Sequence, residues 1–272
     1  MDMSYIAQNG LVLLGCGKMG SAMLQGWLSR GLPPASVWVI DPKPSEWLRG
    51  TGVAINDTLP TSPAIVLIAV KPQMMGDALP SIVAMGGGET LFVSVAAGTP
   101  IAAFEAAFGA TSPIIRTMPN TPAAVARGIT AMIGNAHATP AHMDLAEGLL
   151  SAVGQVVRLQ HEDQMDAVTG VSGSGPAYVF HMIECLAEAG EAQGLPPDLA
   201  MQLAKATVAG AGALAEAADE PPSQLRVNVT SPNGTTQAGL EVLMDADTGL
   251  PPLMRATVKA ATDRSKELRN DG

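Results

Sequence analysis

The chain has 272 residues, of which 47% are hydrophobic, 15% charged and only 3% aromatic, and its formal net charge at pH 7 is −10. Surfaces that bind nucleic acids or anionic membranes need clustered lysine and arginine, so this charge argues against both partners. A chain of this length has room for two domains or one large one, and it can fold without disulfides or a structural metal. The high apolar content favours buried contacts between subunits, although many alanines alone would also raise it.

The two cysteines indicate a reducing compartment. Cys16 and Cys185 have neither CxxC nor Cys/His ligand spacing, so we expect two free thiols and no bound metal. The first residues, MDMSYIAQNG, lack the basic and apolar regions of a signal peptide. The longest wholly apolar run, residues 64–70, is far shorter than the ~20 residues that span a bilayer. These features predict a cytoplasmic protein.

Short apolar runs alternate with helical stretches along the first 160 residues. The runs predict strands at 11–14, 37–40, 64–70, 91–96, 114–118, 128–133 and 155–159. Helices are predicted between them, at 20–29, 101–108 and 141–152. Most of the strands are continuously apolar, as strands covered on both faces are. The alternation therefore predicts a doubly wound, mostly parallel sheet.

After about residue 160 the strand-like runs stop, and Ala, Leu, Met and Glu recur at helical spacing. Helices are predicted at 176–193, 197–217, 221–228, 234–244 and 250–268. Proline begins three of them, where its missing N–H is no loss, and Gly194 follows the end of the first. Small residues in 208–218 suit a dimer interface or an intrachain one equally. We place the boundary between an α/β domain and an all-helical one at 162/163, giving domains 1–162 and 163–272.

A glycine-rich turn follows the first predicted strand. Gly15, Cys16, Gly17, Lys18, Met19 and Gly20 form a complete GxGxxG that also opens a helix. In such a turn the first glycine bends the chain, the second lets the backbone approach a pyrophosphate and the third lets helix and strand pack closely. Chance matches are common in a chain with 29 glycines, and a structural turn is the alternative. The position in the first βαβ unit favours dinucleotide binding.

The end of the second strand bears on the choice of cofactor. Asp41 closes that strand, 21 residues past Gly20, where an acidic side chain normally accepts hydrogen bonds from the adenosine ribose and favours NAD. Lys43 lies two residues further on and suits a 2′-phosphate, or it is a solvated loop lysine. NAD and NADP both remain open.

Two further loops follow the strands at 64–70 and 91–96. Ligands bind at the carboxyl ends of parallel strands, so both loops are expected to border the nicotinamide half of the cofactor. Lys71 in the first loop either contacts the cofactor or caps the strand. The residues concerned are Ala69, Val70, Lys71 and Pro72, and Ala96, Ala97 and Gly98.

The helical half contains two polar turns that open helices. SGSGPAY at 172–178 runs into a helix that starts at Pro176, and NVTSPNGTT at 228–236 runs into the helix at 234. Free N–H groups at a helix start attract anions such as a small carboxylate. Each turn alone could equally be a helix cap.

Six motifs together resemble a known family. They are GCGKMGSAM (15–23), AVKPQ (69–73), VAAGTP (95–100), MPNTPA (118–123), TGVSGSGPAYVF (169–180) and VTSPNGTTQAGL (229–240). In order and spacing, from about residue 10 to 265, the sequence resembles the pyrroline-5-carboxylate reductases. The last two motifs are specific, whereas the first fits many dehydrogenases.

The resemblance implies an α/β Rossmann-type doubly wound domain followed by an all-α C-terminal dimerisation domain, in a homodimer or a larger homo-oligomer. It implies NADPH or NADH as cofactor and active sites to which the partner's helices can contribute. By resemblance or by position, the cofactor contacts are Gly15, Cys16, Gly17, Lys18, Met19, Gly20, Asp41, Asn56, Ala69, Val70, Lys71, Pro72, Ala96, Ala97, Gly98 and Asn228. The substrate contacts are Glu162, Gly173, Ser174, Gly175, Gly234, Thr235 and Thr236.

The sequence departs from the family's pattern at three places. Lys18 stands where the family commonly has Asn, and Asp41-Pro42-Lys43 stands where Ser, Arg or Asn is usual. Both changes weaken an assignment to NADP. Asn233 stands where glycine is usual, and we expect this change to be silent because asparagine tolerates a left-handed backbone.

The implied reaction is hydride transfer to the C=N bond of Δ1-pyrroline-5-carboxylate, giving L-proline, the last step of proline biosynthesis. Backbone N–H groups at 173–175 and 234–236 are expected to hold the carboxylate, and the Thr236 hydroxyl to bond the ring nitrogen, directly or through water. The four histidines are expected to be surface or helix residues, because imine reduction needs no catalytic histidine. A β-hydroxyacid-type dehydrogenase with Lys205 as its catalytic lysine is the alternative enzyme, and a non-catalytic dinucleotide sensor is the alternative class.

Overall fold

The computed structural model describes residues 3–270. Contacts within the chain divide it into two compact units. The sheet unit comprises residues 3–173 and 261–270, and the helical unit comprises residues 174–260. The domain boundary at 162/163 stays a prediction, because division by contacts is a separate criterion.

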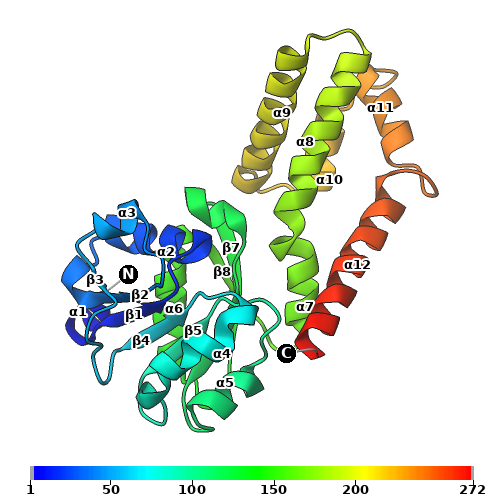
Figure 1. Ribbon diagram of the computed structural model, residues 1–272. Helices are drawn as coiled ribbons and strands as arrows, with labels where there is room; N and C mark the ends of the chain where they lie inside the picture. Colours follow the sequence, from blue (N-terminus) through cyan, green and yellow to red (C-terminus); the bar gives the residue numbers. More distant parts are fainter. Residues whose placement is uncertain (1–2, 271–272) are drawn as a thin grey trace. The chain divides into compact units, whose positions relative to one another are not determined.

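The sheet unit is built on eight strands in the order β3-β2-β1-β4-β5-β6-β7-β8 (Figure 1). From β3 to β6 all neighbours are parallel, β7 is antiparallel to β6, and β8 is parallel to β7. The strands are β1 (Leu11–Leu14), β2 (Val37–Ile40), β3 (Ala54–Ile55), β4 (Ile65–Ile68), β5 (Leu91–Ser94), β6 (Ile114–Met118), β7 (Gly128–Gly134) and β8 (Gly154–Arg158). The predicted fold class is confirmed.

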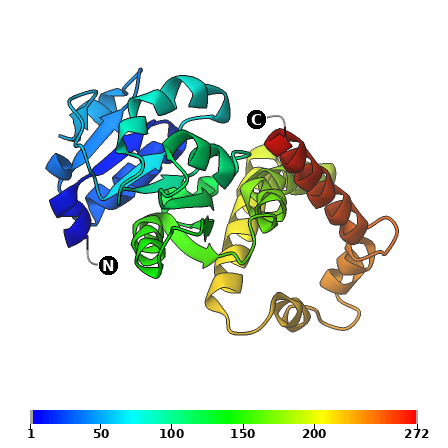
Figure 2. The same ribbon diagram turned by 90° about the horizontal axis from the view of Figure 1, so that it is seen from below.

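Alternate residues of a strand point to opposite faces of the sheet, and here both sets are apolar. Helices therefore cover both faces. Leu11 and Leu13 join one core cluster with Trp27 and Leu149, whereas Val12 and Leu14 join another with Phe104 and Phe108. Figure 2 shows α5 and α6 on opposite sides of the strands. The helices of this unit are α1 (Ser4–Asn9), α2 (Lys18–Ser29), α3 (Glu46–Arg49), α4 (Met75–Ala78), α5 (Ile101–Phe108), α6 (Pro140–Leu150) and α7 (Gln164–Val168).

The helical unit contains α8 (Gly175–Ala192), α9 (Pro197–Ala217), α10 (Pro222–Asn228), α11 (Thr235–Leu243) and the first half of α12 (Leu250–Asn270). Helices α8 and α9 form a hairpin that Gly194 permits, with a φ of 95° directly after the first helix. Gly194 therefore has the predicted role. The five predicted helices are confirmed to within one or two residues.

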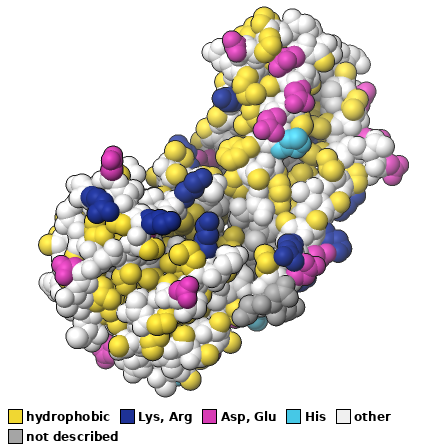
Figure 3. Space-filling view, in the orientation of Figure 1, with side chains coloured by type: hydrophobic (Ala, Val, Ile, Leu, Met, Phe, Trp, Pro, Cys, Tyr) yellow, Lys and Arg dark blue, Asp and Glu magenta, His cyan; other side chains and the backbone are white. Residues whose placement is uncertain are grey.

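The core of the helical unit is very small. Its buried cluster consists of Ala187, Ala200 and Ala204, against which Ile183 and Met201 pack. Many large apolar side chains of this unit are exposed, and Figure 3 shows hydrophobic side chains over its surface. They include Phe180, Met182, Leu186, Leu199, Leu203, Leu214, Val242, Leu243 and Leu253. The unit thus presents apolar surface that it does not bury itself.

The segment before α8 differs from the open Gly/Ser loop expected from the sequence. Residues 169–173 form a π-helical turn, and only Ser174 separates it from α8. Pro176 is the second residue of α8, where its missing N–H has no acceptor within the helix to lose.

None of the helices in residues 3–270 combines the length and the hydropathy that a bilayer crossing requires.

Candidate functional site

The glycine turn between β1 and α2 has the geometry of a phosphate-binding turn. Gly15 has a φ of 90°, and a Cβ there would lie 2.8 Å from Val70 Cγ1. A Cβ on Gly20 would lie 2.3 Å from the Gly15 carbonyl oxygen, so both positions require glycine for packing. By contrast, apart from Gly17 itself and its two chain neighbours, no atom of residues 3–270 lies within 4 Å of a Cβ built on Gly17. The backbone at Gly17 is therefore open to a ligand.

The start of α2 supplies hydrogen-bond donors to the same place. Gly17 is the N-cap, and the first bond of the helix runs from the Ser21 N–H to the Gly17 carbonyl at 2.9 Å. The N–H groups of Lys18, Met19 and Gly20 thus precede the first helical bond and have no acceptor within the helix. Together with the helix dipole they favour an anion beside Gly17. The exposed Lys18 adds a positive charge at this turn.

Asp41 ties the glycine turn to the ends of β2 and β3. Its Oδ2 accepts from the Cys16 N–H at 2.8 Å, and its Oδ1 accepts from the Lys43 N–H at 2.7 Å. Asn56, with a φ of 50°, bonds the Asp41 backbone twice: its Nδ2 donates to the carbonyl at 2.8 Å, and its Oδ1 accepts from the N–H at 2.9 Å. The carboxylate is therefore held in place by the protein, and its contact with the adenosine ribose stays a prediction.

The Cys16 thiol is affected by this arrangement. Burial first, and the charge of Asp41 second, raise the pKa of Cys16 from 9.0 to about 11. The thiol is consequently protonated at neutral pH and is a poor nucleophile. Both cysteines are free, as the sequence predicts.

The other predicted cofactor loops leave the same edge of the sheet. Strands β1, β4 and β5 are adjacent and parallel, so their following loops lie next to one another. The loop after β4 is fixed by the Ala69 N–H, which donates to the Leu14 carbonyl at 2.8 Å. The loop after β5 turns at Gly98, whose φ is 78°. The structure thus brings the residues 15–20, 69–72 and 96–98 to one edge, where open α/β sheets bind ligands.

Glu162 contacts the protein itself. Its Oε1 accepts from Arg116 Nη1 at 2.7 Å and from the Ile101 N–H at 2.9 Å. Arg116 is buried, with 2% of its side chain exposed, whereas Glu162 is about one-third exposed. Glu162 therefore neutralises a buried cation and caps α5 directly after the β5 loop. Contact with substrate stays a prediction for its second oxygen.

Asn120 has a role that sequence reasoning missed. It is 9% exposed, its Oδ1 accepts from the Ile129 N–H at 2.9 Å, and its Nδ2 donates to the Ser172 carbonyl at 3.1 Å. A Cβ on Gly173 would lie 2.5 Å from Met118 Cε. The MPNTPA motif therefore positions the start of the SGSG turn. Its resemblance to the family was recognisable in the sequence, but its partner 52 residues away was not.

The SGSG turn keeps one backbone position open. Apart from its chain neighbours and the backbone of its own helix, no described residue has an atom within 4 Å of a Cβ on Gly175, the first residue of α8. Ser174 makes no side-chain cap bond. These two residues suit the approach of a small anion to the start of the helix.

The second polar turn lies wholly in the helical unit. Gly234 is the N-cap of α11, so Thr235 and Thr236 occupy its first turn, and both are exposed. Asn233 has a φ of 57°, which confirms the left-handed backbone expected there. Asn228 ends α10, where its Oδ1 accepts from Gln224 Nε2 at 2.8 Å.

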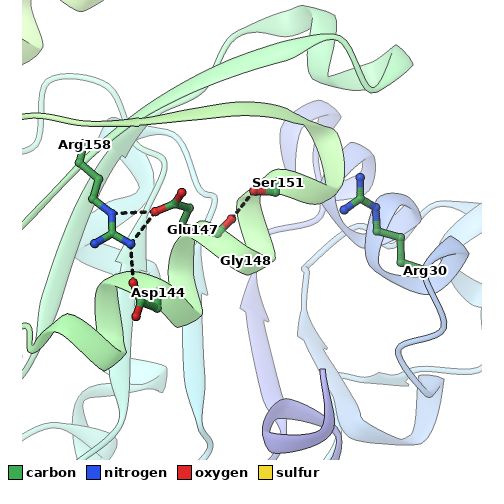
Figure 4. A pocket seen from close by; sticks show the side chains of 6 residues that line it. All are labelled: Arg30, Asp144, Glu147, Gly148, Ser151 and Arg158. Atoms are coloured by element: carbon green, nitrogen blue, oxygen red, sulfur yellow. Dashed lines mark hydrogen bonds and ion pairs between the residues drawn. The ribbon is translucent and has the colours of Figure 1, made fainter. Parts of the chain in front are cut away.

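A surface pocket beside α6 is separate from these residues. Figure 4 shows Arg158 facing Asp144 and Glu147, to which it donates at 2.5 Å and 2.7 Å, with Arg30 on the other side of Ser151. Arg30 follows α2 at its far end, about 18 Å along the helix from Lys18 at 1.5 Å per residue. The pocket includes no predicted site residue. Within residues 3–270 no cluster of His, Cys, Asp or Glu is arranged to hold a metal ion.

The sequence is similar to known proteins along nearly its whole length. Residues 162–268 match the family described as pyrroline-5-carboxylate reductase dimerisation, and residues 10–98 match that described as NADP oxidoreductase, coenzyme F420-dependent. Over 264 residues the chain is 36% identical to a pyrroline-5-carboxylate reductase of Pseudomonas aeruginosa, covering 95% of this chain and 96% of the relative.

Solved structures with the same fold are also similar in sequence. A pyrroline-5-carboxylate reductase from Coxiella burnetii superposes with a TM-score of 0.90 and 31% identity, covering 96% of this chain and 98% of the other. A pyrroline carboxylate reductase from Plasmodium falciparum with NADP bound superposes with a TM-score of 0.82 and 28% identity, covering 97% and 99%.

Proposed function

The chain belongs to the pyrroline-5-carboxylate reductase family, and we propose that it reduces the C=N bond of Δ1-pyrroline-5-carboxylate with NADPH or NADH to give L-proline. The single observation that carries the proposal is the glycine turn, where Gly15 and Gly20 are packed and Gly17 is open beside the first N–H groups of α2. This is the arrangement that a dinucleotide pyrophosphate needs.

The two candidate cofactors differ only in the 2′-phosphate, which would meet Asp41 and Lys43. The fixed carboxylate of Asp41 disfavours that phosphate, whereas the exposed Lys43 favours it. The Plasmodium falciparum relative has NADP bound, and the match over residues 10–98 is to an NADP oxidoreductase family. We therefore propose that the enzyme accepts both, with a preference set by these two side chains.

The protein's part in the reaction is orientation. The reduced nicotinamide supplies the hydride, and the protonated imine of the substrate is already electrophilic. Backbone N–H groups at 173–175 and 234–236 hold the substrate carboxylate, and the Thr236 hydroxyl hydrogen-bonds the ring nitrogen. A threonine hydroxyl is too weak an acid to donate its proton alone, so it orients the nitrogen or relays a proton from water. Binding of this kind turns an encounter in solution into a positioned reaction.

The helical unit supports a homodimer or larger homo-oligomer, because it exposes large apolar side chains around a core of three alanines. The match over residues 162–268 is to a dimerisation family. The net charge of −10 favours small-molecule partners over nucleic acids or anionic membranes. Two free thiols suit the cytoplasm.

The test is oxidation of NADPH and NADH, followed by absorbance, with pyrroline-5-carboxylate, with β-hydroxyacids or their oxo forms, and without substrate. Oxidation that depends on the imine supports the proposal. Turnover with hydroxyacids alone would favour the dehydrogenase alternative, whose candidate Lys205 is exposed on α9. Tight cofactor binding without any turnover would favour a sensor.

Thr236→Ala tests the assignment of the hydroxyl. We expect kcat/KM for the imine to fall by about one to three orders of magnitude, while the Kd of the cofactor stays unchanged. Thr111→Ala, which alters an exposed threonine in the loop before β6, is the matched control and should keep full activity. Unchanged turnover in Thr236→Ala would remove this residue from the mechanism.

A further inference from the structure

The last turns of α12 pack against the loop that follows β5. Although α12 begins in the helical unit, its residues 261–270 belong to the sheet unit. A Cβ built on Gly98, at the turn of the loop, would lie 3.6 Å from Leu268 Cβ and 3.8 Å from the Leu268 carbonyl carbon. The end of the helix therefore lies beside this loop, with space between them for no more than about a methyl group. Glycine is favoured at residue 98 by its φ of 78°.

A buried carboxylate fixes the end of α12 in this position. Asp166 on α7 is 1% exposed, and its Oδ1 accepts from Ser265 Oγ at 2.8 Å. Its Oδ2 lies 2.8 Å from Arg269 Nη1 as an ion pair, without hydrogen-bond geometry. Since a buried charge is costly unless it is paired, Asp166 strongly favours the conformation in which Ser265 and Arg269 stay beside it.

The same short segment also fixes the other end of the β5 loop. Glu162, four residues before Asp166, accepts from the Ile101 N–H, the first of α5. At the start of the loop, the Ala96 N–H donates to Ser94 Oγ at 3.2 Å. The loop is thus held at both ends, and its turn at Gly98 lies beside a helix that Asp166 anchors.

We propose that Asp166, acting through Ser265 and Arg269, is a positioning residue for hydride transfer. It keeps the end of α12 against residues 95–100, and this loop in turn limits the orientations of the nicotinamide. The inference rests on the proposed function, which places that loop beside the nicotinamide. Loosening the loop should slow the chemical step, because a misplacement of about 1 Å can cost about 100-fold in rate. The adenosine half of the cofactor should bind as before, since its contacts lie at the glycine turn and Asp41.

The experiment compares Asp166→Asn, Ser265→Ala and Arg269→Ala in the full-length enzyme. We expect kcat to fall about tenfold or more, the Kd of ADP-ribose to stay within about threefold, and the deuterium isotope effect with 4-deuterated cofactor to increase as hydride transfer becomes slower. Arg269→Lys keeps the charge and should recover part of the rate. Lys266→Ala changes an exposed residue of the same helical turn and should behave like the wild type.

A second readout does not depend on turnover. Hydrogen–deuterium exchange of residues 95–100 should be faster in Ser265→Ala and Arg269→Ala than in the wild type and in Lys266→Ala. These two variants also cover the case in which Asp166→Asn fails to fold. Unchanged exchange and unchanged kcat in both would overturn the proposal, as would a parallel loss of ADP-ribose binding. If the wild type reduces no imine, the proposed function fails. The exchange experiment still tests whether Ser265 and Arg269 hold the end of α12 against residues 95–100.

Discussion

The two units of this chain bury their apolar side chains to very different extents. The sheet unit encloses two large clusters of apolar side chains, one on each face of the strands, and fully buries Trp27, Phe92 and Phe104. The helical unit buries only three alanines as a cluster of its own and leaves Phe180 at 59% exposure. The first unit is stabilised by its own core, whereas the second exposes large apolar side chains of the kind that interfaces between subunits bury.

This contrast separates two requirements for activity. The glycine turn at residues 15–20 and the loops after β4 and β5 are formed within one chain, at the ends of buried strands. The second polar turn, which contains Thr236, belongs to the helical unit, whose exposed apolar side chains favour association with another chain. Changes in the two units should therefore affect assembly and cofactor binding independently. Three experiments test this expectation, and a fourth tests the stability of the sheet unit at the glycine turn.

The largest effect should come from charges placed on the apolar surface of the helical unit. In the double variant Phe180→Asp, Leu203→Asp, we expect the dissociation constant of the dimer to increase by about three orders of magnitude, or about 4 kcal/mol, because two carboxylates would be buried without partners. Sedimentation velocity measures the change. Val125→Asp alters a side chain that is 72% exposed in the sheet unit and should leave the oligomer intact. An unchanged mass distribution in the double variant would show that these apolar side chains are not buried between subunits.

The next largest effect should be confined to the sheet unit. Gly17→Ala should weaken cofactor binding about 10- to 100-fold, because the new methyl group occupies the space for the pyrophosphate, while the melting temperature barely changes. Gly20→Ala should instead lower the melting temperature, since its Cβ would overlap the Gly15 carbonyl oxygen. Fluorescence titration and thermal unfolding distinguish the two variants. Equal destabilisation of both would show that Gly17 is a packing residue as well.

A smaller effect is expected at the adenosine end of the cofactor. Asp41→Asn removes a negative charge, so the ratio of the Kd values for NADPH and NADH should shift about tenfold towards NADPH. Absolute affinities for both should also fall, since the amide can accept only one of the two backbone N–H groups that now bond the carboxylate. Asp57→Asn, an exposed change just after β3, is the control. A constant ratio would mean that Asp41 serves only to tie the loops together.

The smallest effect concerns the pH dependence of stability. The raised pKa of Cys16, about 11 against an ordinary 9.0, means that the unfolded thiol ionises at lower pH than the folded one. The contribution of the Cys16 thiol to the free energy of unfolding is complete below pH 9 and is lost as the pH rises towards 11. Between pH 8 and pH 10 the wild type should lose ~1 kcal/mol more stability than Cys16→Ser, after allowance for the partial exposure of the thiol. Urea unfolding at both pH values checks this, and parallel losses would refute it.

Sequence reasoning succeeded where the signal was local. Strands at 11–14, 37–40 and 114–118 and helices at 101–108 and 197–217 have the predicted bounds. Continuous apolar runs mark the first two strands, and prolines mark the starts of the two helices. The short β3 and α1 were missed, since two and six residues carry too little periodicity.

The contacts that shape the site were beyond the reach of sequence patterns. Arg116 and Glu162 are 46 residues apart, and Asp166 and Ser265 are 99 apart, so their pairing depends on the folded sheet. The reversal at β7 had a local signal that went unused, because the nine residues between β6 and β7 are too few for a parallel crossover. Resemblance to a family predicted the site residues, and the structure gave their partners within the protein.

The alanine cluster between α8 and α9 has a practical consequence for handling the protein. Because this hairpin has so small a core, its stability should depend on association with another chain. Dilution should therefore destabilise it, and the midpoint of heat unfolding should rise with protein concentration. Assays at nanomolar enzyme would then measure a population depleted of competent assemblies, and comparisons of specific activity need matched concentrations.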